Sequence, residues 1–291
     1  MNFLDHFSGR FVESQRRRFP DHLMQGGGDA GWPVLDGVVA VFFTSRTGST
    51  ALSRLARMHF DLGEVGEAFN GPALTTRAER WGLDSLRDAA MRQVEAASPA
   101  RWFMFKSGGP GAINAARMGF LADHATVLHP ILLLRRDILG QALSVFAARH
   151  TRQYHSTQTP SAVLTDRDYD PAAIRQIIGV ILGGNRRLGD LAQGFPRPPR
   201  LLLYEDFRDG DTAAPLAILG ETGLPRRSTP LPPFEAVRRN THPLNARFRE
   251  WFMDAITPAD RDLLAQHEAF VAAWQARCHE GAHGSASKAG G

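Results

Sequence analysis

Two short polar stretches of this 291-residue chain carry residue types that bind anions. The first, residues 44–50 (TSRTGST), combines hydroxyl side chains with one glycine and one arginine. Glycine permits a tight turn with inward-facing N–H groups, hydroxyls donate hydrogen bonds, and arginine adds a permanent fork of donors. The stretch predicts an oxyanion cradle, although an N-capped turn between a strand and a helix would use the same residues. The predicted cradle consists of Ser45, Arg46, Thr47, Gly48, Ser49 and Thr50.

The second stretch, residues 134–144 (LRRDILGQALS), places Arg136 eight residues before Ser144. In a helix that begins at Asp137, Ser144 lies about two turns in, near the side of the preceding loop. The two side chains could clamp a second phosphate, whereas a surface Arg–Asp pair beside a helix serine would give the same pattern. Two anion sites on neighbouring strand ends would suit a ligand with two separated phosphates.

Strands and helices alternate around these stretches. Short apolar runs predict four strands, at residues 38–43, 101–106, 131–134 and 200–204. Periodic patterns predict helices at residues 51–60, 75–97, 110–123, 137–149, 171–191, 245–255 and 258–278. This order predicts an α/β fold, a P-loop-like parallel sheet flanked by helices with a helical C-terminal portion. We expect one domain over residues 1–278 and a disordered tail over 279–291. Ligands of such folds bind at the carboxyl ends of the strands, where both polar stretches lie.

Composition narrows the class of protein. The chain has 34 basic and 30 acidic residues, and Lys106 is the one lysine outside the C-terminal tail. A net charge of +4 without a long basic block gives no reason to expect a nucleic-acid partner. Because no long apolar run and no apolar signal core occur, we expect no membrane span and a cytoplasmic location. A single cysteine, Cys278, excludes a disulfide framework and CxxC-type metal sites, and we expect no metal.

Taken together, TSRTGST and LLRRDILGQALS resemble the two phosphate motifs of sulfotransferases that use 3′-phosphoadenosine-5′-phosphosulfate (PAPS). The closer resemblance is to the bacterial trehalose 2-sulfotransferase-like branch, with its Arg-Ser/Thr-Gly-Ser-Thr loop and its Arg-Arg-Asp…Gln-Ala-Val/Leu-Ser segment. Residues 63–69 (GEVGEAF) also resemble that branch, in which a glutamate precedes an aromatic residue after the first helix. The resemblance covers residues 38–70, 101–106 and 131–155.

The resemblance implies a sulfuryl transfer from PAPS to an acceptor hydroxyl by in-line displacement. The loop from Arg46 to Thr50 would hold the 5′-phosphosulfate, and Arg136 with Ser144 would hold the 3′-phosphate. Arg46 would also stabilise the charge that builds on the leaving phosphate. Lys106 is either a second catalytic cation or a strand-end lysine whose ammonium reaches solvent.

The other implied roles concern the base, the acceptor and the edge of the nucleotide site. Glu67 matches the position proposed as general base, in competition with Glu64 and with histidines. His150, Tyr154 and His155 belong to a long polar stretch that would contact the acceptor, a carbohydrate or another small-molecule alcohol. Arg238 and Arg239 show a weaker resemblance to a nucleotide-binding segment. Related enzymes make a homodimer possible.

Two further interpretations stay open, and one motif has a structural explanation. The chain could be a kinase or nucleotide hydrolase with a degenerate P-loop, although GxxxxGK followed by Ser or Thr is absent. It could also be a non-catalytic protein that binds a nucleotide or a glycan. Glu205 and Asp206 resemble a recurrent Tyr-Glu-Asp of sulfotransferases, where we expect them to cap backbone or to pair with an arginine.

Overall fold

A computed structural model describes residues 2–26, 31–154, 158–228 and 242–286. Its sheet has four strands in the order β2-β1-β3-β4, and every neighbouring pair is parallel. The strands are β1 (Gly37–Phe43), β2 (Trp102–Ser107), β3 (Leu128–Leu134) and β4 (Arg200–Leu203). The predicted α/β class with a parallel sheet flanked by helices is confirmed. β3 begins three residues earlier than the apolar run alone indicates, because Pro130 and His129 lie within it.

β1 lies inside the sheet, and all seven of its residues are buried. Its side chains alternate between two cores, as successive residues of a strand must. Phe42 packs with α6 (Gly109–Arg117) and α9 (Pro171–Gln193) on one face, whereas Val41 packs with α3 (Ser49–His59) on the other. Burial on both faces explains why this strand reads as one continuous apolar run.

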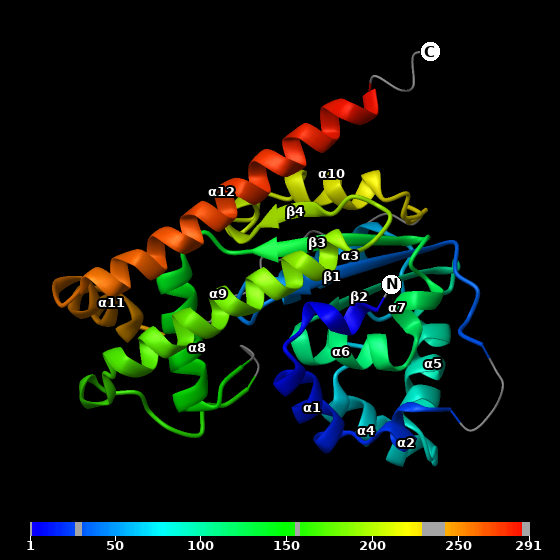
Figure 1. Cartoon of the computed structure of the whole chain (residues 1–291), viewed down its shortest axis with the longest axis horizontal. Coiled ribbons are helices and arrows are strands. Elements are labelled where there is room, and N and C mark those ends of the chain that lie inside the picture. The colour runs from blue at the N-terminus through cyan, green and yellow to red at the C-terminus, as the bar shows by residue number, and fades with distance from the viewer. Residues whose placement is uncertain (1, 27–30, 155–157, 229–241, 287–291) are drawn as a thin grey trace.

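Helices cover both faces of the sheet (Figure 1). Before β3 the chain forms η1 (Phe3–His6), α1 (Gly9–Arg18), α2 (Asp21–Met24), α3, α4 (Gly71–Trp81), α5 (Leu86–Ala97), α6 and α7 (Phe120–Asp123). After β3 it forms α8 (Ile138–Thr151), η2 (Asp166–Asp168), α9, η3 (Tyr204–Asp206), α10 (Ala213–Glu221), α11 (Leu244–Asp254) and α12 (Pro258–Ala286). The C-terminal portion is helical, as predicted. No helix within the described ranges combines the length and apolarity that a bilayer crossing needs.

Three predicted helix boundaries are wrong. The single helix over residues 75–97 is two helices, because Gly82 ends α4 in the left-handed conformation and Ser85 caps α5. The helix over residues 110–123 is also two, separated at Gly119 with φ 81°. In both cases an apolar stripe continues through the capping residues and hides the break. The last helix, α12, continues eight residues past the predicted end to Ala286.

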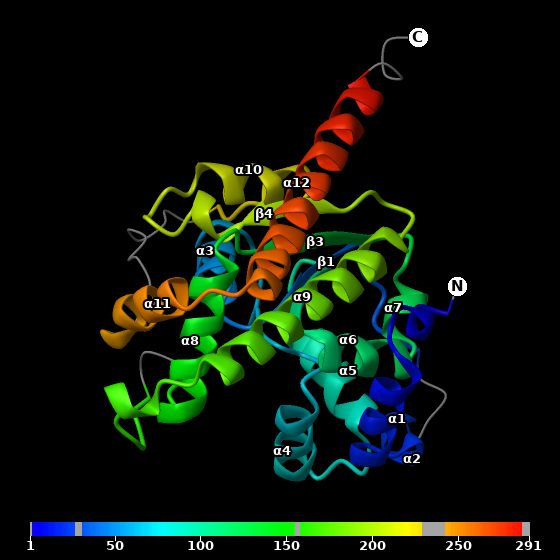
Figure 2. The same cartoon turned by 60° about the vertical axis from the view of Figure 1, so that its left-hand side comes forward.

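A third apolar cluster lies where α8, α9 and α11 meet (Figure 2). Phe248 and Phe252 of α11 are fully buried there against apolar residues of α8 and α9. This packing holds α8 against α9 and α11. Since α8 follows β3 directly, the cluster also fixes the loop at the carboxyl end of that strand.

Candidate functional site

The loop after β1 turns sharply into α3 through two left-handed residues. Arg46 has φ 70° and Gly48 has φ 80°. A Cβ atom at Gly48 would lie 2.6 Å from the Tyr204 ring. Both the positive φ and this close contact therefore require glycine at this position. Thr47 is fully buried and donates a hydrogen bond from Oγ1 to the Thr44 carbonyl at 3.0 Å. Ser49, at the start of α3, accepts from Ser53 Oγ through its carbonyl.

Buried amide side chains hold this loop in place. Gln141 of α8 donates from Nε2 to Thr44 Oγ1 at 2.9 Å and to the Ser45 carbonyl at 2.8 Å. Thr44 in turn donates to Oδ1 of Asn185 on α9. Both amides are fully buried. Neither amide was among the predicted site residues, although a polar residue among the apolar residues of α8 is a signal that could have identified Gln141.

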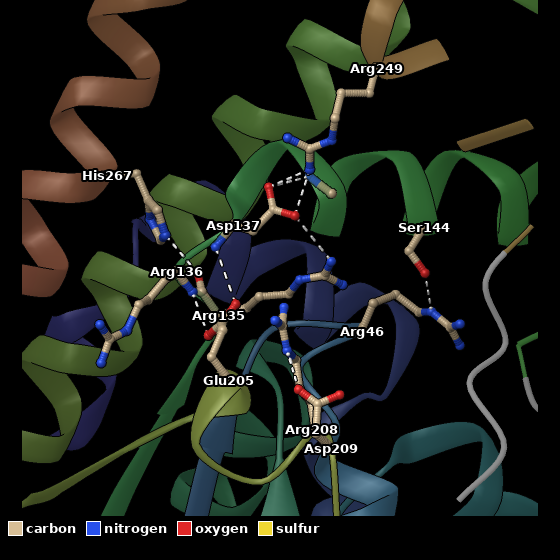
Figure 3. A network of polar contacts seen from close by, with 11 residues as sticks. Arg46, Arg135, Arg136, Asp137, Ser144, Glu205, Arg208, Asp209, Arg249 and His267 are labelled. Atoms are coloured by element: carbon tan, nitrogen blue, oxygen red, sulfur yellow. Dashed lines mark hydrogen bonds and ion pairs between the residues drawn. The ribbon is translucent and has the colours of Figure 1, made fainter. Parts of the chain in front are cut away.

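Arg46 joins the two stretches that the sequence analysis placed at different phosphates. Its Nε donates to Ser144 Oγ at 2.8 Å (Figure 3). Its Nη1 donates to the Tyr154 carbonyl at 2.9 Å. Burial lowers the pKa of Arg46, and the neighbouring Arg135 guanidinium lowers it further. The guanidinium still carries its charge at neutral pH, because arginine keeps its proton in proteins. The structure therefore brings Arg46 and Ser144 into one site.

Arg135 and Arg136 point in opposite directions at the end of β3. Arg136 is exposed, lies 3.7 Å from Asp206, and points away from Arg46 in Figure 3. Arg135 instead lies between Asp137 and Arg46, with its guanidinium carbon 5.1 Å from the centre of the Tyr204 ring. Its Nε is buried and has no hydrogen-bond partner among the described residues. The structure thus places Arg135, which the sequence analysis overlooked, beside Arg46, and does not bring Arg136 to Ser144.

The start of α8 is closed by carboxylates. Asp137 caps the helix by accepting from the Gly140 N–H at 2.8 Å, and Arg249 of α11 donates to both of its oxygens (Figure 3). Burial acts to raise the pKa of Asp137, but the bonds from Arg249 and Gly140 hold it below its ordinary value. Glu205 accepts the backbone N–H groups of Arg136 and Asp137 at 3.0 and 3.3 Å. The expected capping role of Glu205 is confirmed, and so is the pairing of Asp206 with an arginine.

Lys106 reaches the start of α3 from the neighbouring strand β2, and Glu67, in the loop between α3 and α4, lies near its ammonium. Lys106 is nearly fully buried, and its Nζ donates to Thr50 Oγ1 at 3.3 Å. Burial lowers its pKa, and the Glu67 carboxylate partly opposes this. Glu67 is exposed and accepts from Asn70 Nδ2 at 3.2 Å. The competing Glu64 is exposed and lies 4.0 Å from Arg77 instead.

A cavity of about 390 Å³ lies beside these groups. Thr44, Ser45, Glu67 and Lys106 all line it, at the carboxyl ends of β1 and β2. The chain leaves β1 toward α3 on one face of the sheet and leaves β2 toward α6 on the other. A crevice between two strands whose connections diverge in this way is where open α/β sheets bind ligands. The cavity is large enough for a small organic molecule.

The other predicted site residues lie further from this cavity or beyond the described part of the chain. His150 faces Asp168, with 3.6 Å between Nε2 and Oδ1, and does not line the cavity. Tyr154 is half-exposed, and it contacts the site through its carbonyl, which accepts from Arg46. His155, Arg238 and Arg239 lie outside the described residues. Over the described ranges, no group of three or more His, Cys, Asp or Glu side chains is arranged to hold a metal ion.

Comparison with known proteins adds no family assignment: no protein-family model and no curated protein matches this chain.

Proposed function

We propose that this chain is a sulfotransferase with a P-loop-like nucleotide site, which moves the sulfuryl group of PAPS to the hydroxyl of a small acceptor. The observation that carries the proposal is the hydrogen bond between Arg46 and Ser144. These residues lie 98 positions apart, in the two motifs that resemble the phosphate motifs of PAPS-dependent enzymes. A single anionic ligand at this point can therefore contact both motifs.

The donors at the loop after β1 fit a multiply anionic nucleotide. Arg46, Arg135 and Lys106 supply three cations around the start of α3. The N-cap of α3 is Gly48, which offers no side chain to its first N–H groups, and a helix N-terminus attracts anions. The buried Nε of Arg135 needs an acceptor, since an orphaned buried donor is costly. A phosphate oxygen would provide that acceptor.

The residues around the cavity suit the chemistry of the transfer. PAPS supplies an activated sulfuryl group. A bond forms between the acceptor oxygen and sulfur while the bond from sulfur to the phosphate oxygen breaks, and the electron pair leaves with the phosphate. Glu67, oriented by Asn70, takes the proton of the acceptor hydroxyl. Arg46 and Lys106 stabilise the negative charge that develops on the leaving phosphate, in a partly buried setting where such charges interact strongly.

Calorimetric titration with 3′,5′-bisphosphoadenosine, ADP and ATP tests the nucleotide site. We expect the bisphosphate to bind at least about ten-fold more tightly than ATP, because the Arg46–Ser144 region then contacts a second phosphate. ATP that binds as tightly as the bisphosphate would contradict the proposal and favour a kinase or nucleotide hydrolase.

Transfer of labelled sulfate from PAPS to a mixed panel of alcohols tests the reaction. We expect Glu67→Gln to keep bisphosphate affinity and to reduce transfer about 10²-fold or more, as loss of a general base does. Glu64→Gln is the matched control, because Glu64 lies outside the cavity. Equal transfer by wild type and Glu67→Gln would remove Glu67 from the mechanism. Bisphosphate binding without any transfer would support the non-catalytic interpretation.

A further inference from the structure

The cavity is lined by an apolar wall, by charged groups, and by the neutral polar residues Thr44, Ser45, Asn70 and Ser107 at the ends of β1 and β2 and in the nearby loop. The wall comes from the N-terminal segment, β1, α8 and α9, which are far apart in the sequence. Its main members are Phe7, Phe11, Phe43, Val145, Ile181 and Leu188. All but the partly exposed Phe11 are buried. A sugar presents hydroxyl groups around its whole ring, so this wall would leave several of them without hydrogen bonds. An aromatic or aliphatic body fits it better.

Two guanidinium groups line the same cavity. Arg149 lies one helical turn after Val145 on α8, so both side chains lie on the cavity side of that helix. Arg187 lies on α9, with its guanidinium carbon 5.9 Å from the centre of the Phe11 ring. Within the described part of the chain, neither arginine forms an ion pair with a carboxylate.

The charges of the lining are unbalanced. Lys106, Arg149 and Arg187 carry three positive charges, and Glu67 carries the one negative charge. Lys106 and Glu67 already face each other across the reacting end of the cavity. Arg149 and Arg187 therefore remain to attract an anionic group, and arginine binds carboxylates and similar groups through a planar fork of N–H donors.

On the basis of the proposed function, we infer that the acceptor is a hydroxylated carboxylic acid with an apolar body. Its hydroxyl lies at Glu67 and Lys106, its aromatic or aliphatic body packs on the apolar wall, and its carboxylate is held by Arg149 and Arg187. The hydroxyl oxygen forms the new bond to sulfur and its proton passes to Glu67, while the bisphosphate leaves with the electron pair of the broken bond. Of the two acceptor classes expected from the sequence, carbohydrates and other small-molecule alcohols, this inference favours the second, and neutral sugars are poor acceptors.

Calorimetry with three probes tests this inference directly: 3-(4-hydroxyphenyl)propanoate, its methyl ester, and trehalose. Each probe is titrated into the wild-type chain with and without saturating 3′,5′-bisphosphoadenosine. We expect the acid to bind at least about ten-fold more tightly than the ester, and trehalose to bind most weakly. An ester or a sugar that binds as tightly as the acid would overturn the inference.

Arginine variants test whether Arg149 and Arg187 cause the preference for the acid over its methyl ester. We expect Arg187→Met and Arg149→Met each to abolish most of the preference for the acid over the ester, while bisphosphate affinity stays unchanged. Methionine retains an apolar stem over Phe11, which limits structural damage. Arg186→Met is the matched control, because Arg186 is exposed and donates to Gln266 rather than lining the cavity. An equal effect of Arg186→Met would overturn the inference, and so would loss of bisphosphate affinity in Arg187→Met.

The same titrations separate this inference from the proposed function. Binding of the acid needs no bisphosphate and no transfer, so it reports on the cavity alone. If the chain binds the acid through Arg149 and Arg187 but not the bisphosphate, the sulfotransferase proposal fails and the assignment of the cavity stands. If it binds the bisphosphate and sulfates trehalose in preference to the acid, the assignment of the acceptor fails and the sulfotransferase proposal stands.

Discussion

The loops after β1 and β3 occupy equivalent places on neighbouring parallel strands, yet they satisfy their backbone donors in different ways. At α8 the Asp137 carboxylate caps the helix, and Glu205 accepts the N–H groups of the preceding loop. At α3 the N-cap is Gly48, whose lack of a side chain leaves the helix without such a cap. The cations Arg46, Arg135 and Lys106 lie around the start of α3 instead.

This difference shows that position at the edge of a sheet does not by itself make an anion site. A helix N-terminus attracts an anion only while its donors are not already occupied by the protein's own carboxylates. At the start of α8 the backbone N–H groups already donate to Asp137 and Glu205, so this end acts as a rigid support. Among the described residues, no carboxylate caps the α3 start, and the exposed Glu67 lies near Lys106 instead. In the proposed function this start therefore takes the phosphates of the ligand.

Substitution of Arg46 tests the α3 end most severely. We expect Arg46→Ala to reduce sulfate transfer by about 10²- to 10³-fold, because the leaving phosphate loses a preorganised donor. Arg46→Lys keeps the charge but loses the Nε bond to Ser144, and we expect an intermediate rate. Single-turnover assays with PAPS, together with circular dichroism to verify folding, measure the effect. Full activity of a folded Arg46→Ala variant would remove this loop from the mechanism.

Substitution of Asp137 tests the α8 end. We expect Asp137→Ala to lower the free energy of unfolding by about 2 kcal/mol, because it removes a helix cap and leaves Arg249 without its carboxylate. Affinity for 3′,5′-bisphosphoadenosine should change little, since Glu205 still occupies the neighbouring N–H groups. Urea denaturation measures the effect. Glu221→Ala, which breaks only a surface pair with Arg200, is the control and should cost less than about 1 kcal/mol.

The pH dependence of the same variant gives a second test. The pKa of Asp137 is lowered in the folded chain, so its stabilising effect is present above its ordinary pKa of 3.8. That effect is lost as pH falls through the folded-state value, where the carboxylate takes up a proton. We therefore expect the stability difference between wild type and Asp137→Ala to narrow below about pH 4. A difference that stays constant into acid would contradict the ionic part of the cap.

Much of the fold was predictable from the sequence, because burial on both faces of β1 leaves an unbroken apolar run. The loop after β1 was also predictable, since its glycine and hydroxyls carry a local signal. The breaks between α4 and α5 and at Gly119 were not, because the apolar stripes continue through the capping residues. Local capping then overrides helical periodicity.

The site was less predictable where a contact spans the chain. Arg135 and Arg136 are adjacent in sequence, and only the direction of the backbone at the end of β3 decides which one meets Arg46. Asp137 is held by Arg249, which lies 112 residues away. Tertiary packing likewise decides that Glu67 lies near Lys106 while Glu64 lies near Arg77. Residue types and spacing indicate candidates for such contacts but do not fix their partners.

A pair of glycine variants separates backbone strain at the α3 start from contact with its surroundings. Gly48 and Gly119 have nearly the same φ, 80° and 81°, but a Cβ atom meets the Tyr204 ring only at Gly48. We expect Gly119→Ala to cost about 1 kcal/mol of unfolding free energy from strain alone, and Gly48→Ala to cost about 1–2 kcal/mol more. Urea denaturation of both variants measures the difference. Equal costs would show that the ring of Tyr204 moves aside and does not fix the turn.

The smallest expected effect is the pH dependence that Lys106 gives to the transfer rate, which a charge-conserving substitution of Lys106 tests. Burial lowers the pKa of Lys106, so the ammonium loses its proton at a pH below the ordinary lysine value of 10.5. If this charge assists transfer, the rate with an aliphatic alcohol falls as pH rises toward that value, because an aliphatic hydroxyl does not titrate there. In Lys106→Arg the guanidinium stays charged at alkaline pH, so we expect the decline in rate to disappear. Because the guanidinium differs in geometry from the ammonium, we also expect a several-fold lower rate at pH 7. Arg46 does not produce the decline, because a guanidinium keeps its proton in proteins across this pH range. Identical pH profiles for wild type and Lys106→Arg would assign Lys106 to the support of Thr50 alone.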